Sequence, residues 1–157
     1  MISRFFFILF LTGVWFAPAP APAATEQGAE HYLPGPLPAE VVRVIDGDSV
    51  EVRVRVWLDQ EVTTTVRLQG LDTAELKSRC VQEHDLAIAA KARLEELLRG
   101  QKVELYDIQR DKYGGRVIAK IRTQGEADIA KTLIAENLGR AYEGKKRGSW
   151  CERADAE

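Results

Sequence analysis

The feature that most constrains the fold is a strict alternation of valine with charged residues. Between residues 50 and 56, valine occupies every even position and Glu or Arg every odd one. A period of two predicts a β-strand with one buried and one solvated face. The segment LDQE (58–61) indicates a turn, and apolar residues or threonine then resume alternate positions, which predicts a return strand over 62–70 with Arg67 on the opposite phase.

The rest of the chain continues this pattern of short elements. Before the hairpin, VIDGDSV (44–50) indicates the end of a strand and a turn. After it, hydrophobic spacing predicts a helix from about Val81 to Arg99, with Gly100 after its end. A strand over 102–108, a glycine loop over 110–116 and a strand over 117–121 are expected next. The last predicted element is a helix over about 129–137 that Asp128 caps. Three strands, a helix, two strands and a helix suit an α+β fold built on a closed five-stranded barrel of the OB type.

The N-terminal segment differs from the rest. Arg4 is followed by an apolar run and then by Ala21-Pro22-Ala23, which fits a cleavage site. We therefore expect a signal peptide at 1–23 and a secreted or periplasmic protein; an uncleaved anchor is the alternative. A proline-rich linker at 24–40, one domain at 41–151 and a short irregular tail at 152–157 complete the predicted organisation.

Charge and cysteine content narrow the function classes. The net charge of −2 excludes a generally basic nucleic-acid coat, although residues 101–147 hold eleven Lys and Arg against seven Asp and Glu, a local net charge of +4. Cys80 and Cys151 match no zinc pattern. In an exported chain an even cysteine count favours one disulfide; two free thiols are the alternative.

Acidic and basic residues at the predicted strand ends are the candidates for chemistry. Asp48 and Asp72 together can hold a hard cation such as Ca²⁺ or Mg²⁺, and Glu75 follows closely enough to reach a metal-bound water. Val50 excludes an EF-hand loop, which needs an oxygen ligand there. Arg67 and Arg116 offer guanidinium groups that match phosphate oxygens. The combination favours phosphoryl transfer over glycoside cleavage, which needs two carboxylates and gains nothing from two arginines.

Each of these residues also has a purely structural interpretation. Asp46-Gly47 forms a good turn that Asp48 could simply cap, Arg67 could pair with an acid on a neighbouring strand, and residues 113–115 could be a plain hairpin turn. Taken singly, each is the more common case. Taken together, these structural interpretations are less convincing than a common site, because five charged residues fall at strand ends that one barrel would bring together.

The stretches VIDGDSV, VRLQGLDTAE (66–75) and DKYGGRV (111–117) resemble the staphylococcal nuclease (thermonuclease) family, over about Val41 to Tyr142. The resemblance implies an OB-fold barrel with helices and Ca²⁺-dependent cleavage of DNA and RNA. By position it implies calcium carboxylates at Asp48 and Asp72, a backbone carbonyl ligand at Thr73, a general base at Glu75, phosphate-binding arginines at Arg67 and Arg116, and nucleotide contacts at Lys112 and Tyr113.

Three departures from the family pattern stand out. Ala74 replaces a usual proline and is expected to loosen the loop that holds Glu75; an additional glycine precedes Arg116; and the long C-terminal helix is missing. The ending RGSWC (147–151) suggests that a Cys80–Cys151 bridge takes over the tethering. Asp46 is expected to support Asp48 without binding the metal itself, and Gly47 to permit the tight turn.

The sequence therefore predicts an exported, monomeric, Ca²⁺-dependent endonuclease that acts on DNA or RNA and has no stable membrane association after signal cleavage. The competing hypothesis is a non-catalytic OB-fold module that binds nucleic acid or a protein partner. Such a module has no need of the full set of acids and arginines.

Overall fold

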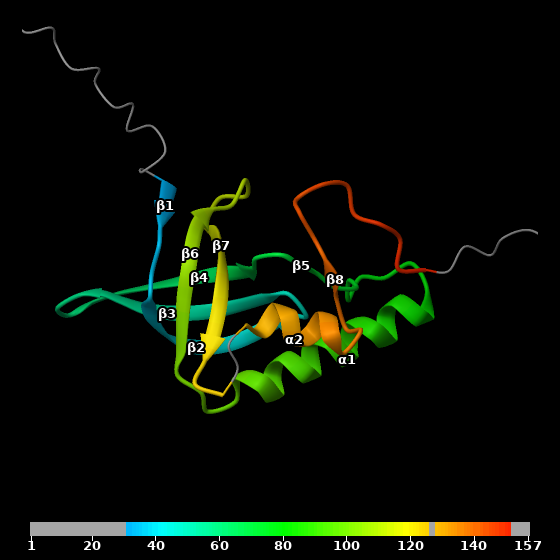
Figure 1. The fold of residues 1–157 in the computed structure, drawn as a ribbon, viewed down its shortest axis with the longest axis horizontal. Helices are drawn as coiled ribbons and strands as arrows, with labels where there is room; N and C mark the ends of the chain where they lie inside the picture. Colours follow the sequence, from blue (N-terminus) through cyan, green and yellow to red (C-terminus); the bar gives the residue numbers. More distant parts are fainter. Residues whose placement is uncertain (1–30, 126–127, 152–157) are drawn as a thin grey trace, which may run out of the picture.

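A computed structural model describes residues 31–125 and 128–151 (Figure 1). Five strands close into a barrel in the order β6-β2-β3-β4-β7, and pairing of β6 with β7 completes the ring. Only β4 and β7 run parallel; the other neighbours are antiparallel. The predicted α+β, OB-type fold is confirmed. The strands are β2 (Leu37–Asp46), β3 (Ser49–Trp57), β4 (Gln60–Leu68), β6 (Val103–Arg110) and β7 (Arg116–Thr123).

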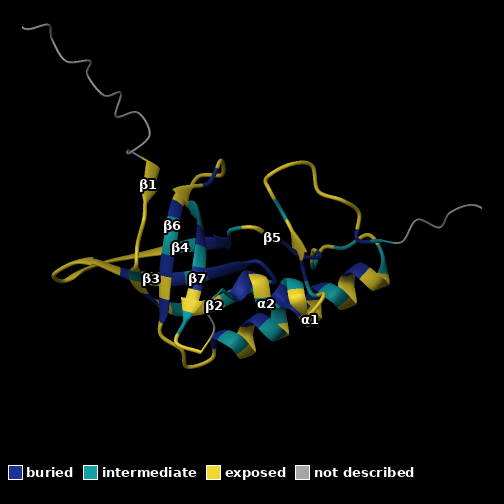
Figure 2. Ribbon diagram, in the orientation of Figure 1, coloured by how far each residue is buried: buried dark blue, intermediate teal, exposed yellow. Residues whose placement is uncertain are grey.

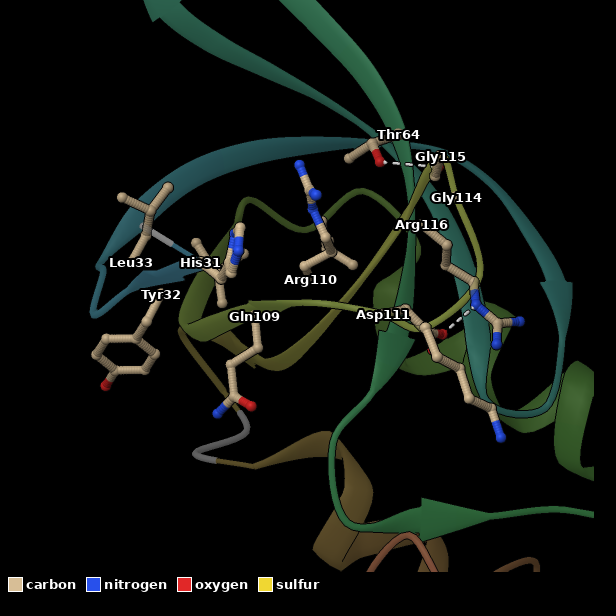
Figure 3. Close-up of a pocket in the computed structure, with 13 residues that line it drawn as sticks. His31, Tyr32, Leu33, Thr64, Gln109, Arg110, Asp111, Gly114, Gly115 and Arg116 are labelled. Atoms are coloured by element: carbon tan, nitrogen blue, oxygen red, sulfur yellow. Dashed lines mark hydrogen bonds and ion pairs between the residues drawn. The ribbon is translucent and has the colours of Figure 1, made fainter. Parts of the chain in front are cut away.

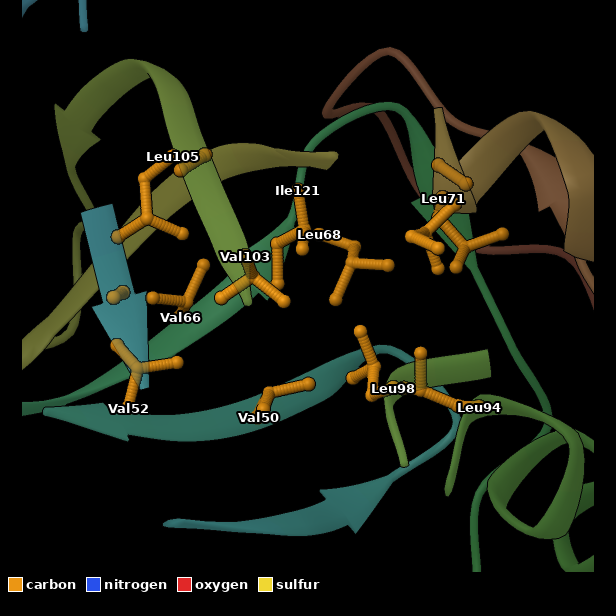
Figure 4. Packing of buried hydrophobic residues seen from close by; sticks show 14 of the residues in the cluster. Val50, Val52, Val66, Leu68, Leu71, Leu94, Leu98, Val103, Leu105 and Ile121 are labelled. Atoms are coloured by element: carbon orange, nitrogen blue, oxygen red, sulfur yellow. The ribbon is translucent and has the colours of Figure 1, made fainter. Parts of the chain in front are cut away.

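The valine alternation builds the barrel core as expected, but over a shorter stretch. Val50 and Val52 are fully buried and Val54 is nearly so, in contact with apolar side chains from β4, β6, β7 and α1 (Figure 4). Val56 and Val62, which share the same phase, are about half exposed at 49% and 48%. Their exposure follows from the length of the β3–β4 hairpin, which extends past the barrel into solvent (Figure 2).

Two helices cover one side of the barrel. α1 (Val81–Leu98) begins at Cys80, whose sulfur accepts the Glu83 amide, and it buries Ala87, Ala90, Leu94 and Leu98. Gly100 follows its end at a φ of 68°, a conformation that glycine tolerates best.

α2 (Ile129–Ala135) is capped by Asp128 as predicted but stops two residues short of the predicted end. Asn137 takes a φ of 60°, and the Leu138 amide donates to the Leu133 carbonyl, which closes the helix in a Schellman turn.

Three short strands lie outside the predicted strands. β1 (Tyr32–Leu33) pairs with β6, and β2 begins within the predicted 24–40 linker, where Ala39 is buried between Val54 and Val103. The prolines are compatible with this because Pro34 and Pro36 lie before β2 and Pro38 is its second residue, next to the strand end where a missing N–H is tolerated. β5 (Leu71–Asp72) pairs with β8 (Arg140–Ala141), and neither segment was predicted to be a strand.

The predicted signal peptide and the tail at 152–157 lie outside the described residues. Among the described helices, none combines the length and the apolar character that crossing a bilayer requires.

Candidate active site

A cleft of about 730 Å³ opens at one mouth of the barrel. It lies between the β2–β3 turn, β4, the β6–β7 loop and the chain after β8. Seven of the predicted site residues line it, namely Asp46, Asp48, Arg67, Glu75, Lys112, Tyr113 and Arg116. Asp72 and Thr73 are each 3% exposed; Asp72 reaches the cleft through contacts with Arg67 and Arg147.

Asp48 is a buried acid that lines the cleft. It is 4% exposed and forms an ion pair of 2.8 Å with Arg67, while the Ser49 hydroxyl donates to its Oδ1 at 2.8 Å. Burial raises the pKa of the Asp48 carboxyl to about 6, against the opposing effect of Arg67. Asp46 accepts the Asp48 amide at 3.0 Å, so it shapes the turn from which Asp48 projects.

Gly47 is required by a close approach of chains. A Cβ at this position would lie 2.8 Å from the Ala90 Cβ and 2.8 Å from the Thr73 Oγ1. The turn between β2 and β3 therefore presses directly against α1 and against the residue after Asp72, which brings Asp48 and Asp72 to the same place.

Asp72 is held from two sides. The Trp150 indole donates to its Oδ2 at 3.2 Å, and Arg67 approaches its Oδ1 at 3.9 Å. Arg67 also donates to the Leu71 carbonyl at 3.3 Å and lies over the Tyr142 ring at 5.8 Å. Arg67 thus links both aspartates while it is only 10% exposed at its side chain.

The carboxylates fit a hard cation. The buried Asp72 Oδ1 accepts no hydrogen bond and is compensated by the Arg147 Nε at 2.8 Å, so a cation already stabilises this oxygen. Asp48, Asp72 and Glu75 supply oxygen ligands of the kind that Ca²⁺ prefers. The one set of three close Cys, His or acidic groups among the described residues, Cys80, Glu83 and Cys151, is no competitor, because its two sulfurs form a disulfide.

Glu75 points to the cleft from an exposed position, with its side chain 52% exposed. Its Oε1 forms a very short ion pair with Arg147. The same guanidinium lies 2.8 Å from Asp72 and 3.8 Å from Asp48. Partial burial lowers the pKa of Arg147, but Glu75, Asp72 and Asp48 outweigh it and raise the pKa overall, which keeps the guanidinium charged.

Packing fixes the loop that carries Glu75. Ala74 is 2% exposed and lies in a cluster with Ala87 and Trp150. The disulfide between Cys80 and Cys151 joins the start of α1 to the residue after Trp150. The expected loosening by Ala74 is therefore offset here by apolar packing.

Arg116 lines the cleft from the start of β7. Its Nε donates to Asp111 at 2.5 Å (Figure 3). Its guanidinium lies 5.0 Å from the centre of the Tyr113 ring. Lys112 lies 5.1 Å from the same ring. The additional glycine, Gly115, takes a φ of 76°, and Arg116 still pairs with Thr65 at the start of β7 and faces the cleft.

Four residues of the site were missed by sequence reasoning. Arg147 and Trp150 lie in the stretch RGSWC, which was noticed only for its cysteine. Tyr142 lies against Arg67, and Asp111 is a buried acid that orients Arg116. Only Asp111 carried a local signal, as an acidic residue within the predicted glycine loop at 110–116.

Comparison with known proteins agrees with this geometry. No curated protein matches the chain. The family model described as staphylococcal nuclease homologue matches residues 65–155, which is more than half of the chain and includes Arg67, Asp72, Glu75 and Arg116. Asp48 lies before the matched segment, and the fold brings it to the others. The chain therefore belongs to the staphylococcal nuclease homologue family.

Proposed function

We propose that this protein is an exported, Ca²⁺-dependent endonuclease that hydrolyses phosphodiester bonds of DNA, RNA or both. Family membership supports a nuclease-type hydrolase with a nucleic-acid substrate. The observation that carries the finer proposal is one cleft that brings together buried carboxylates, an exposed glutamate and two arginines from the neighbouring strands β4 and β7. An OB-fold module that only binds nucleic acid has no use for the buried acids, which repel a polyanion.

Asp48 and Asp72 would hold the cation, with the Thr73 carbonyl as a further proposed ligand. Bound Ca²⁺ would supply Lewis-acid polarisation and a fixed position for the reacting groups. Glu75 is exposed enough to meet water and takes the proton of the attacking water as general base. Glu75 has to part from Arg147 to do so.

The two arginines stabilise the charge that develops on the phosphate. Arg67 is held rigidly by Asp48 and by the Leu71 carbonyl, and Arg116 by Asp111. Preorganised donors of this kind need no reorganisation during the reaction, which is why they stabilise a transition state. Lys112 and Tyr113 are exposed in the same cleft and would contact the nucleic acid beside the scissile bond.

Plasmid cleavage by the purified protein, with Ca²⁺ or with EDTA, tests the proposal. We expect EDTA to abolish cleavage and Glu75→Gln to slow it by about 10²–10⁴-fold, the usual contribution of a general base. Arg67→Ala and Arg116→Ala should each slow it by about 10²–10³-fold.

The matched control is Glu143→Gln, the same chemical change at a glutamate outside the cleft lining that pairs with Lys145. Circular dichroism checks the fold of each variant. If folded Glu75→Gln cleaves as fast as the parent while the arginine variants lose affinity for DNA, the protein is a binding module and the proposed catalysis is wrong.

The Phe-rich N-terminal segment and the disulfide both support export. Fractionation of cells that express the full chain tests this part separately: the mature protein should appear in the periplasm or medium with residues 1–23 removed.

A further inference from the structure

Arg147 occupies a position that none of the proposed catalytic roles explains. Each of its guanidinium nitrogens approaches a different carboxylate: Nε lies 2.8 Å from Asp72, one terminal nitrogen pairs with Glu75, and the other lies 3.8 Å from Asp48. These are the three acids that we assign to the cation and the water. A positive charge of the protein's own therefore lies among the oxygens that a metal ion would need.

Arg147 is not required to neutralise Asp48 in the way that Arg67 is. Arg67 pairs with Asp48 at 2.8 Å and is 10% exposed, so it is a fixed part of the site. Arg147 is 37% exposed and comes from a surface segment. A long side chain that is partly in water can leave at much smaller cost than a buried one.

The segment that carries Arg147 is anchored at its ends. We call residues 142–151 the strap; it runs from β8 to the start of α1 (Figure 1). The Tyr142 amide donates to the Gly70 carbonyl and its hydroxyl to the Lys145 carbonyl. At the other end, Arg140 donates to the Ser149 carbonyl and the disulfide holds Cys151.

Between these anchors the strap is attached through Arg147. Over residues 146–148 of the described chain, the hydrogen bonds and ion pairs are those of the Arg147 side chain. The guanidinium also separates the acids: among the described residues, the only three acidic, His or Cys groups with ligand atoms within 4.8 Å of one another are Cys80, Glu83 and Cys151. A small cation has to remove Arg147 before it can draw the three carboxylates together.

We propose that Arg147 is an internal cation that competes with the divalent metal for Asp48, Asp72 and Glu75. This inference rests on the proposed metal site. The strap then sets the metal concentration that the enzyme requires, and Glu75 becomes free to act as base only when Arg147 has left. The apparent dissociation constant of a ligand rises in proportion as the competent state is less populated. A site that Arg147 fills for about nine-tenths of the time would therefore bind Ca²⁺ about tenfold more weakly than an open one.

Calorimetric titration of the purified protein with CaCl₂, without nucleic acid, tests the competition. Arg147→Ala should bind Ca²⁺ about tenfold more tightly than the parent. Arg147→Lys keeps the charge but cannot direct a nitrogen at each of the three carboxylates, so its Ca²⁺ affinity should lie between those of the parent and Arg147→Ala. Arg147→Gln is a second neutral variant in case the alanine change disturbs the strap.

Lys146→Ala is the matched control. It removes the same charge from the neighbouring position of the strap, and Lys146 makes no hydrogen bond or ion pair with the described residues. Its Ca²⁺ affinity should stay within about twofold of the parent, because a solvent-screened charge acts weakly on the site.

Thermal unfolding separates competition from a merely structural role. In EDTA, Arg147→Ala should have a lower Tm than the parent, since three carboxylates lose their counter-ion. In saturating Ca²⁺ the two proteins should have the same Tm, because the metal then neutralises these carboxylates in both. If Arg147→Ala binds Ca²⁺ no more tightly than the parent, or lowers Tm equally with and without Ca²⁺, the inference is overturned while the metal site stands. If neither the parent nor any Arg147 variant binds Ca²⁺, the proposed metal site itself is wrong, and the inference falls with it.

Discussion

Removal of the Cys80–Cys151 disulfide should destabilise the protein far more than any surface change. The bridge joins residues 71 apart in sequence. On the chain-entropy model, a closed loop of this size lowers the entropy of the unfolded chain enough to stabilise the fold by roughly 4 kcal/mol. For a domain of about 120 residues this corresponds to a fall in Tm of about 16 °C on removal of the bridge.

The substitution has to spare the local role of Cys80. Its sulfur caps α1 by accepting the Glu83 amide at 3.4 Å. Serine is a good N-cap residue, so the double variant Cys80→Ser, Cys151→Ser keeps a cap acceptor and removes only the covalent link. Equilibrium urea unfolding in Ca²⁺-free buffer measures the loss.

Two comparisons make the test sharp. The parent in a thiol reductant should lose about as much stability as the double variant, whereas the reductant should leave the variant unchanged. A loss below about 1 kcal/mol in both would refute the reasoning, because it would mean that the bridge does not restrict the unfolded chain in the way that the loop length requires.

Two further predictions concern the site. Gly47→Ala should destabilise the fold by about 1–3 kcal/mol, the usual cost of overpacking, because the added carbon meets Ala90 and Thr73 at 2.8 Å. Urea unfolding measures this loss. The control is Gly114→Ala, because a Cβ at that position has open space. Ca²⁺ binding should weaken as pH falls through about 6, because burial raises the pKa of Asp48 to about 6 and its protonated form is a poor ligand; the expected loss is about tenfold per pH unit below that point. Equal dissociation constants at pH 5 and pH 7.5 would contradict this.

Local patterns in the sequence were sufficient for the barrel and most of its elements. The alternation at 50–56 predicted β3 because a strand with one buried face must repeat every two residues. Asp128 and Gly100 marked helix ends because capping is a property of a few neighbouring residues. Asp48, Arg67, Glu75 and Arg116 could be selected because several charged residues fall at strand ends that one barrel brings together, although each alone has a common structural role.

Tertiary structure decided what depends on partners distant in sequence. Three strands, β1, β5 and β8, are too short to give a periodic signal in the sequence. They form because β1 pairs with β6 and because β5 pairs with β8. Trp150 and Arg147 contact Asp72 from 78 and 75 residues away, and no local rule connects them. The solvent exposure of Val56 and Val62 depends on where the barrel ends. A sequence alternation shows which face of a strand is apolar, but it does not show how far the neighbouring strands cover that face.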